Sequence, residues 1–125
     1  MAVDFHPKPR PFHTAIPEFE NGNDTPRNYL ERCIEVIEAH EESIGAFVAT
    51  NLDNARSAAD ESTARWKSGT VLSSIDGMPI GVKDVMETAD MVTEQGSPLF
   101  KGWRMGRDCA AVAALREAGA VVIGK

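Results

Sequence analysis

A short apolar run, residues 120–124 (AVVIG), constrains the fold of this chain more than any other feature of the sequence. A strand without polar residues is typical of a parallel sheet that is covered on both faces. A helix is predicted directly before it over residues 109–118, with Val112 and Leu115 facing the core and Gly119 ending it. Together with a further strand predicted earlier in the chain, this order predicts an α/β fold.

The position of this apolar run bears on domain organisation. It is followed only by Lys125, yet a central strand needs neighbours and cover on both faces. We therefore expect residues 25–125 to form the amino-terminal portion of a single domain that is truncated at its C-terminal end. Residues 1–24 are rich in proline, which fixes φ and lacks a backbone donor, so they are predicted to form an extended arm.

Two helices and two further strands are predicted between the arm and the last strand. Thr25 and Pro26 are typical of a helix start, and an apolar stripe follows them. Residues 44–49 (IGAFVA) are predicted to form a strand, and a second helix is predicted from an Asp53 cap to Lys67. Residues 78–85 (MPIGVKDV) predict another strand, and residues 86–107 a long loop, which is often functional.

Composition excludes several classes of function. The net charge is −6, with 13 basic and 19 acidic residues, and the basic residues are scattered, so a nucleic-acid partner is not expected. No apolar run is long enough to span a membrane, and the N-terminus lacks the layout of a secretory signal. We therefore expect a cytoplasmic protein with no membrane partner. The two cysteines, Cys33 and Cys109, are interpreted as small buried hydrophobic residues rather than a disulfide.

Three segments together carry a resemblance to a known family: residues 76–84 (DGMPIGVKD), 94–98 (EQGSP) and 107–125. In order and spacing they resemble the amidase-signature family over about residues 25 to 125. The resemblance implies the amino-terminal part of that family's fold, a mixed open sheet covered by helices. It also implies hydrolysis of carboxamide or related C–N bonds of a small-molecule amide by a Ser/cis-Ser/Lys triad, with no metal and no organic cofactor.

The same resemblance assigns the residues. Lys83 corresponds to the catalytic base, whereas the nucleophilic and bridging serines belong to a Gly/Ser-rich segment that this sequence does not contain. Gln95, Gly96 and Ser97 become candidates for the substrate pocket or for a loop beside it. The serine pair Ser73-Ser74 precedes the lysine strand and lacks flanking glycines, so it is interpreted as a surface loop.

A physical argument for Lys83 stands beside the resemblance. Side chains alternate along a strand, so Ile80 and Val82 share one face while Gly81 and Lys83 share the other, which carries little bulk before the lysine. Asp84 lies on the face opposite Lys83 and is expected to bond to backbone or to a loop. A lysine that acts as a base needs a pKa near 7 to 8 instead of about 10.4, which burial can provide. The plainer interpretation is that Lys83 ends a strand with its ammonium in water.

Two other interpretations of function stay open. The chain alone is expected to be inactive, and it can be a non-catalytic fragment or subunit that needs another polypeptide to complete its sheet. Alternatively, the same scaffold can serve as the glutamine-hydrolysing subunit of an amidotransferase. The sequence does not decide between a homodimer and a complex with a partner subunit.

Overall fold

The computed structural model of the chain describes residues 10–125. Its elements, in chain order, are η1 (Phe12–Thr14), α1 (Ile16–Glu20), α2 (Pro26–Ile44), α3 (Leu52–Ser68), β1 (Pro79–Gly81), η2 (Pro98–Phe100), α4 (Ala110–Glu117) and β2 (Val121–Gly124). In this part of the chain no helix is both long and apolar enough to cross a membrane.

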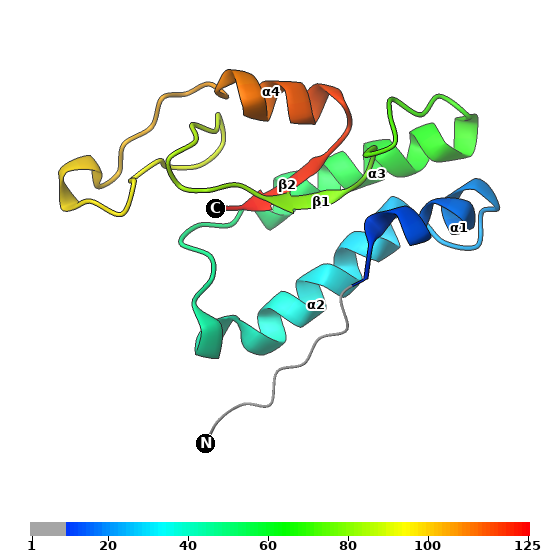
Figure 1. Cartoon of the computed structure of the whole chain (residues 1–125), viewed down its shortest axis with the longest axis horizontal. Coiled ribbons are helices and arrows are strands. Elements are labelled where there is room, and N and C mark those ends of the chain that lie inside the picture. The colour runs from blue at the N-terminus through cyan, green and yellow to red at the C-terminus, as the bar shows by residue number, and fades with distance from the viewer. Residues whose placement is uncertain (1–9) are drawn as a thin grey trace.

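The two strands form a small parallel sheet between two helical layers. Ile80 of β1 lies opposite Val122 of β2, and the register shifts between Ile80 and Gly81. Successive side chains of a strand point to opposite faces. Val121 therefore packs with α2 and α3, whereas Val122 packs with Val112 of α4. In Figure 1, α4 lies on one side of the strands and α2 on the other. The predicted α/β fold with a parallel sheet is confirmed.

The helices begin and end largely at predicted signals. The Thr25 side chain accepts a hydrogen bond from the Asn28 amide at 3.1 Å, which caps α2 as expected. At α3 the cap is Asn51, two residues before the predicted Asp53, and Gly69 ends the helix in the left-handed conformation as expected. The small side chains on α3 let α2, α3 and the sheet approach closely, and they form one buried cluster: Leu30, Ile34, Ala55, Ala59, Val121 and Ile123.

The prediction of a strand over residues 44–49 is wrong. Helix α2 continues to Ile44, and Gly45 ends it in the left-handed conformation with a φ of 63°. The first two residues of the apolar run therefore belong to the end of a helix. The pairing comes slightly later. Residues 48–51 lie antiparallel along the outer edge of β2, with hydrogen bonds between the Ala49 carbonyl and the Lys125 amide at 2.9 Å and between the Asn51 amide and the Ile123 carbonyl at 3.0 Å.

The prediction of an extended arm is also wrong for its described part, residues 10–24. Helix α1 forms there because proline is tolerated in the first turn of a helix, where its missing N–H has no partner to lose. Phe12 and Phe19 are buried and pack edge-on against the Tyr29 ring. These aromatic contacts fold the segment back onto α2. Residues 1–9 of the predicted arm lie outside the described residues.

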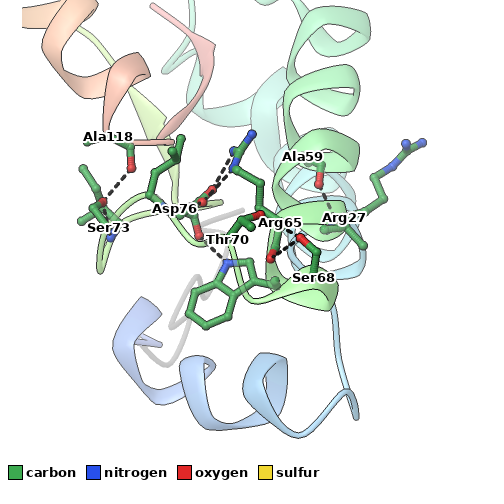
Figure 2. Close-up of polar contacts among 12 residues, drawn as sticks. Arg27, Ala59, Arg65, Ser68, Thr70, Ser73, Asp76 and Ala118 are labelled. Carbon is green, nitrogen blue, oxygen red and sulfur yellow. Dashed lines mark hydrogen bonds and ion pairs between the residues drawn. The ribbon is translucent and has the colours of Figure 1, made fainter.

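A buried ion pair holds the turn that leads into β1. Asp76 has no exposed area, and its carboxylate accepts hydrogen bonds from Arg65 Nε and Nη2 at 2.8 and 2.7 Å, as Figure 2 shows. Burial opposes ionisation of Asp76, but the hydrogen bonds from Arg65 and from the Leu72 amide outweigh it and hold the Asp76 pKa below its usual value. A Cβ atom at Gly119 would lie 2.6 Å from Asp76 Oδ1, so only glycine fits beside the pair.

Candidate active site

Lys83 lies just beyond the carboxyl end of β1. The strand predicted over residues 78–85 is much shorter in the structure, because only Pro79–Gly81 pair with β2. The chain still runs beside β2 for one more residue, since the Val82 amide donates to the Gly124 carbonyl at 3.0 Å. A turn follows in which the Met86 amide donates to the Lys83 carbonyl at 2.9 Å.

The two faces of this segment differ as the alternation predicts. Val82 is 8% exposed and packs with Met91, Val112 and Val122, whereas Gly81 and Lys83 are exposed. Within residues 10–125 the Lys83 ammonium makes no hydrogen bond and no ion pair. A Cβ atom at Gly81 would lie 3.4 Å from the Phe47 ring, so the face that carries Lys83 is open with one aromatic ring beside it.

Asp84 is tied to the long loop, as predicted. Its carboxylate accepts a hydrogen bond from the Glu94 amide, at 3.3 Å to Oδ1 and 3.2 Å to Oδ2, and its backbone carbonyl accepts one from the Gln95 amide at 3.0 Å. The residue that follows Lys83 in sequence therefore anchors residues 94–95 at the same edge of the sheet. Residues 84–107 otherwise hold only the short helix η2, which confirms the predicted loop.

The side chain of Lys125 is the feature of this edge that sequence reasoning missed. It is completely buried, and its Nζ atom donates to the Val92 carbonyl at 2.9 Å and to Thr93 Oγ1 at 2.5 Å. It also lies 3.3 Å from Asp84 Oδ1. One signal was present in the sequence: a lysine that directly follows a strand expected to be buried on both faces must itself begin inside the protein.

The three predicted pocket or loop residues form a tight turn next to Asp84. The Ser97 amide donates to the Glu94 carbonyl at 2.9 Å, and the two residues between them, Gln95 and Gly96, have φ values of 55° and 65°. A positive φ is costly for a residue with a side chain, so the hydrogen bonds to Asp84 must hold Gln95 in place. Gln95 and Gly96 are exposed.

The serines of the chain do not form a nucleophilic pair with Lys83. Ser97 Oγ accepts a hydrogen bond from the Leu99 amide at 3.3 Å and caps η2. Ser73 Oγ donates to the carbonyl of Ala118 at 2.6 Å (Figure 2), and Ser74 is exposed. Ala118 precedes β2, whereas Lys83 follows the carboxyl end of the parallel strand β1. The described residues also contain no group of three or more potential metal ligands. What this edge presents is an accessible amine without a nucleophile beside it.

Comparison with known proteins gives consistent results in sequence and in structure. The model of the family described as Amidase matches residues 28–125. A glutamyl-tRNA(Gln) amidotransferase subunit from Anaeromyxobacter sp. (strain K) is 38% identical over 96 residues, which are 77% of this chain and 20% of that protein. The subunit of the same name from Rhodopirellula baltica is 32% identical over 110 residues, 88% of this chain and 22% of that protein.

Solved structures agree with the sequence matches. The native peptide amidase of Stenotrophomonas maltophilia superposes with a TM-score of 0.80 at 28% identity, over 87% of this chain and 23% of that chain. A structure described as a vestigial protein complex that reveals the origins of an s-triazine catabolic enzyme superposes with a TM-score of 0.82 at 28% identity, over 89% of this chain and 24% of that chain. The chain thus spans between a fifth and a quarter of the length of these relatives.

Proposed function

This chain belongs to the amidase family, and we propose that its Lys83 is the general base of a hydrolase that cleaves carboxamide or related C–N bonds. The triad of the reaction consists of a nucleophilic serine, a bridging serine and Lys83. By parent protein we mean a polypeptide that contains these residues together with both serines.

The observation that carries the proposal is the place of Lys83 at the edge of the sheet. In open α/β sheets, ligands bind outside the carboxyl ends of the strands. Lys83 follows the carboxyl end of β1, its side chain is exposed, and the loop that bears Gln95 is bonded to the next residue. An amine at this position is accessible to a hydroxyl group from a further part of the protein. A lysine that is buried in a core is not.

In the proposed reaction the neutral amine of Lys83 takes a proton from the bridging serine, which takes one from the nucleophilic serine. The serine oxygen bonds to the carbonyl carbon of the substrate. The C–N bond then breaks, and the nitrogen leaves with a proton as ammonia or an amine. Water cleaves the resulting ester, which releases the carboxylic acid and restores the serine.

The test is the substitution Lys83→Met in the parent protein. We expect turnover of a small carboxamide to fall by about 10³-fold, since a general base contributes about 10²- to 10⁴-fold. The unfolding midpoint should stay unchanged, because Lys83 is exposed. Lys101→Met, which removes an exposed lysine of the loop, is the matched control. Full activity of Lys83→Met would refute the assignment.

A second candidate function rests on the names of the relatives. The proteins that are 38% and 32% identical are amidotransferase subunits, so the parent protein can be the glutamine-hydrolysing subunit of such a complex. Ammonia release from glutamine would then depend on Lys83 and rise when partner subunits are added. Hydrolysis of simple carboxamides at a rate that partner subunits do not change would argue for a stand-alone amidase.

A non-catalytic role for the 125-residue chain itself is favoured by its exposed apolar side chains. Val48 is 70% exposed and Leu99 is 91% exposed, and both can pack against a further polypeptide. Size-exclusion chromatography of the chain tests this role. Self-association, or recruitment of a separately expressed remainder of the domain, is expected, whereas a monodisperse monomer with two-state unfolding would contradict it.

A further inference from the structure

The side chain of Lys125 and its acceptors, Asp84, Val92 and Thr93, form what we call the Lys125 cluster. An ammonium group has three N–H donors and no acceptor. The Nζ atom donates hydrogen bonds to the Val92 carbonyl and to Thr93 Oγ1, and it forms an ion pair with Asp84, whose Oδ1 atom lies 3.3 Å away. Lys125 is therefore bound as a donor in this arrangement.

The free energy of a buried ion pair does not by itself explain this cluster. Removing a cation from water costs several kcal/mol, and apolar residues of similar volume in the place of such a pair often leave a protein equally stable. Lys125 has no exposed side-chain area, and Asp84 is 15% exposed. What such a pair can provide is a fixed geometry for the segments that it joins, and here it joins the end of β2, the loop and the residue after Lys83.

The segments around Lys83 are held from several sides, although its own side chain is not. Before it, the Val82 amide is bonded to Gly124, the residue that precedes Lys125. After it, Asp84 is bound through its carboxylate to Lys125 and to the Glu94 amide, and through its carbonyl to the Gln95 amide. The backbone of Lys83 thus lies between two attachments, both of which lead to the end of β2.

We propose that Lys125 is a positioning residue for Lys83. By holding Asp84 and the carbonyl of Val92 on the inner side of the chain, it fixes the direction in which the Lys83 amine leaves the edge of the sheet. It also holds Asp84, whose carbonyl binds the Gln95 amide of the neighbouring turn. This inference rests on the proposed function of Lys83 as a base, and Lys125 itself touches neither substrate nor the reacting atoms.

The first test is Lys125→Met in the parent protein, which removes the charge and keeps an unbranched stem. We expect kcat per active site, counted by titration of the nucleophile, to fall about 10- to 100-fold, because a displacement of about 1 Å has effects of this size. KM should change less than about threefold, since the base acts in the transition state and not in binding. Lys67→Met, at an exposed position on α3, is the control and should leave both constants unchanged.

The second test uses a milder pair, in case Lys125→Met does not fold. Thr93→Val removes the hydroxyl acceptor and keeps the shape of the side chain, whereas Thr93→Ser keeps the hydroxyl. We expect about a three- to tenfold lower kcat for Thr93→Val and rescue in Thr93→Ser. Amide hydrogen exchange of Gln95 and Met86 should become faster in Thr93→Val only, because these amides are bonded to the carbonyls of Asp84 and Lys83.

The outcomes separate this inference from the proposed function. If Lys83→Met is inactive while Thr93→Val and Lys125→Met keep the kcat of the unchanged protein per active site, the positioning role is refuted and the proposed function stands. A smaller active fraction with unchanged kcat would likewise make Lys125 purely structural and refute it. If Lys83→Met is fully active, the proposed function itself fails.

Discussion

The carboxyl ends of the two parallel strands carry the same residue in opposite surroundings. Strand β1 leads to Lys83, which is exposed, and β2 leads to Lys125, whose side chain is completely buried among three acceptors. In both places a glycine of the strand stands just before the lysine or one residue earlier. The difference teaches that the strand end only places an amine at this edge, and that the surrounding segments decide whether it is free to react or held as a donor.

The surroundings differ because of where each strand lies in the sheet. Strand β2 has β1 on one side and residues 48–51 on the other, and residues 92–93 cover its end. Among the described elements β1 has only β2 as a neighbour, and the Lys83 side chain is exposed before the turn that follows it. The amine of Lys83 therefore stays accessible, as a base that must meet a separate nucleophile requires.

The largest effect that would sharpen this comparison is expected from Lys125→Met. It should lower the free energy of unfolding by about 3 kcal/mol, because it removes the cation that faces Asp84 and the donor that binds the Val92 carbonyl and the Thr93 hydroxyl. Lys83→Met should change it by less than about 0.5 kcal/mol, as is usual for exposed positions. Urea unfolding of both variants measures the difference. Equal destabilisation by the two substitutions would break the comparison.

The next effect concerns the start of β1, which the Arg65–Asp76 pair holds. Asp76→Asn should lower the free energy of unfolding by about 2 kcal/mol at neutral pH, since it removes the charged partner of the mostly buried Arg65 guanidinium. The Asp76 pKa is lowered in the folded state, so its stabilisation is complete above the usual aspartate pKa of about 3.9 and is lost as the pH falls through the lowered value.

Because the Asp76 pKa is lowered, the pH dependence of stability is a second measurement on the same variant. As the pH falls below about 4, the unchanged protein should lose stability more steeply than Asp76→Asn, which has no carboxylate to protonate at this position. Thermal unfolding over a pH series measures both slopes. Parallel slopes would show that the pair contributes little, and that β1 is held mainly by its contacts with β2.

A matched pair of glycine substitutions compares the two strand ends directly. A Cβ atom at Gly124 would lie 2.5 Å from the Ala49 carbonyl oxygen, whereas one at Gly81 would lie 3.4 Å from the Phe47 ring. Gly124→Ala should therefore lower the free energy of unfolding by about 1 to 2 kcal/mol through overpacking, and Gly81→Ala should lower it only slightly. Chemical denaturation of the two variants gives the values. A larger loss of stability for Gly81→Ala than for Gly124→Ala would mean that the face of β1 beside Gly81 has no room for a side chain.

The smallest effect is expected at the hydroxyl of Thr93. Thr93→Val should lower the free energy of unfolding by about 1 kcal/mol, the usual net contribution of one hydrogen bond, and Thr93→Ser should restore most of it. Differential scanning calorimetry can resolve this pair. Equal stability of the two variants would indicate that the carbonyl of Val92 and the carboxylate of Asp84 suffice to hold Lys125.

The predictions from sequence succeeded where local patterns decide structure. The Thr25 cap, the Gly69 stop, the apolar character of β2 and the long loop all depend on residues close together in the chain. The predictions failed where distant contacts compete with local preference. Tyr29 packs against Phe12 and Phe19 and folds a proline-rich segment into a short helix. The error at residues 44–49 has a local cause instead, because Gly45 ends α2 in the left-handed conformation inside the apolar run.

The sequence by itself determined the family and the position of Lys83 after an apolar strand, because both are written in contiguous segments such as residues 76–84. Only the tertiary structure decided the surroundings of the two lysines. Whether an ammonium group is solvated or bound depends on acceptors from separate segments, and Asp84 and Thr93 come together with Lys125 only when β1, β2 and the loop assemble. No pattern of neighbouring residues in the sequence specifies these contacts of Lys125.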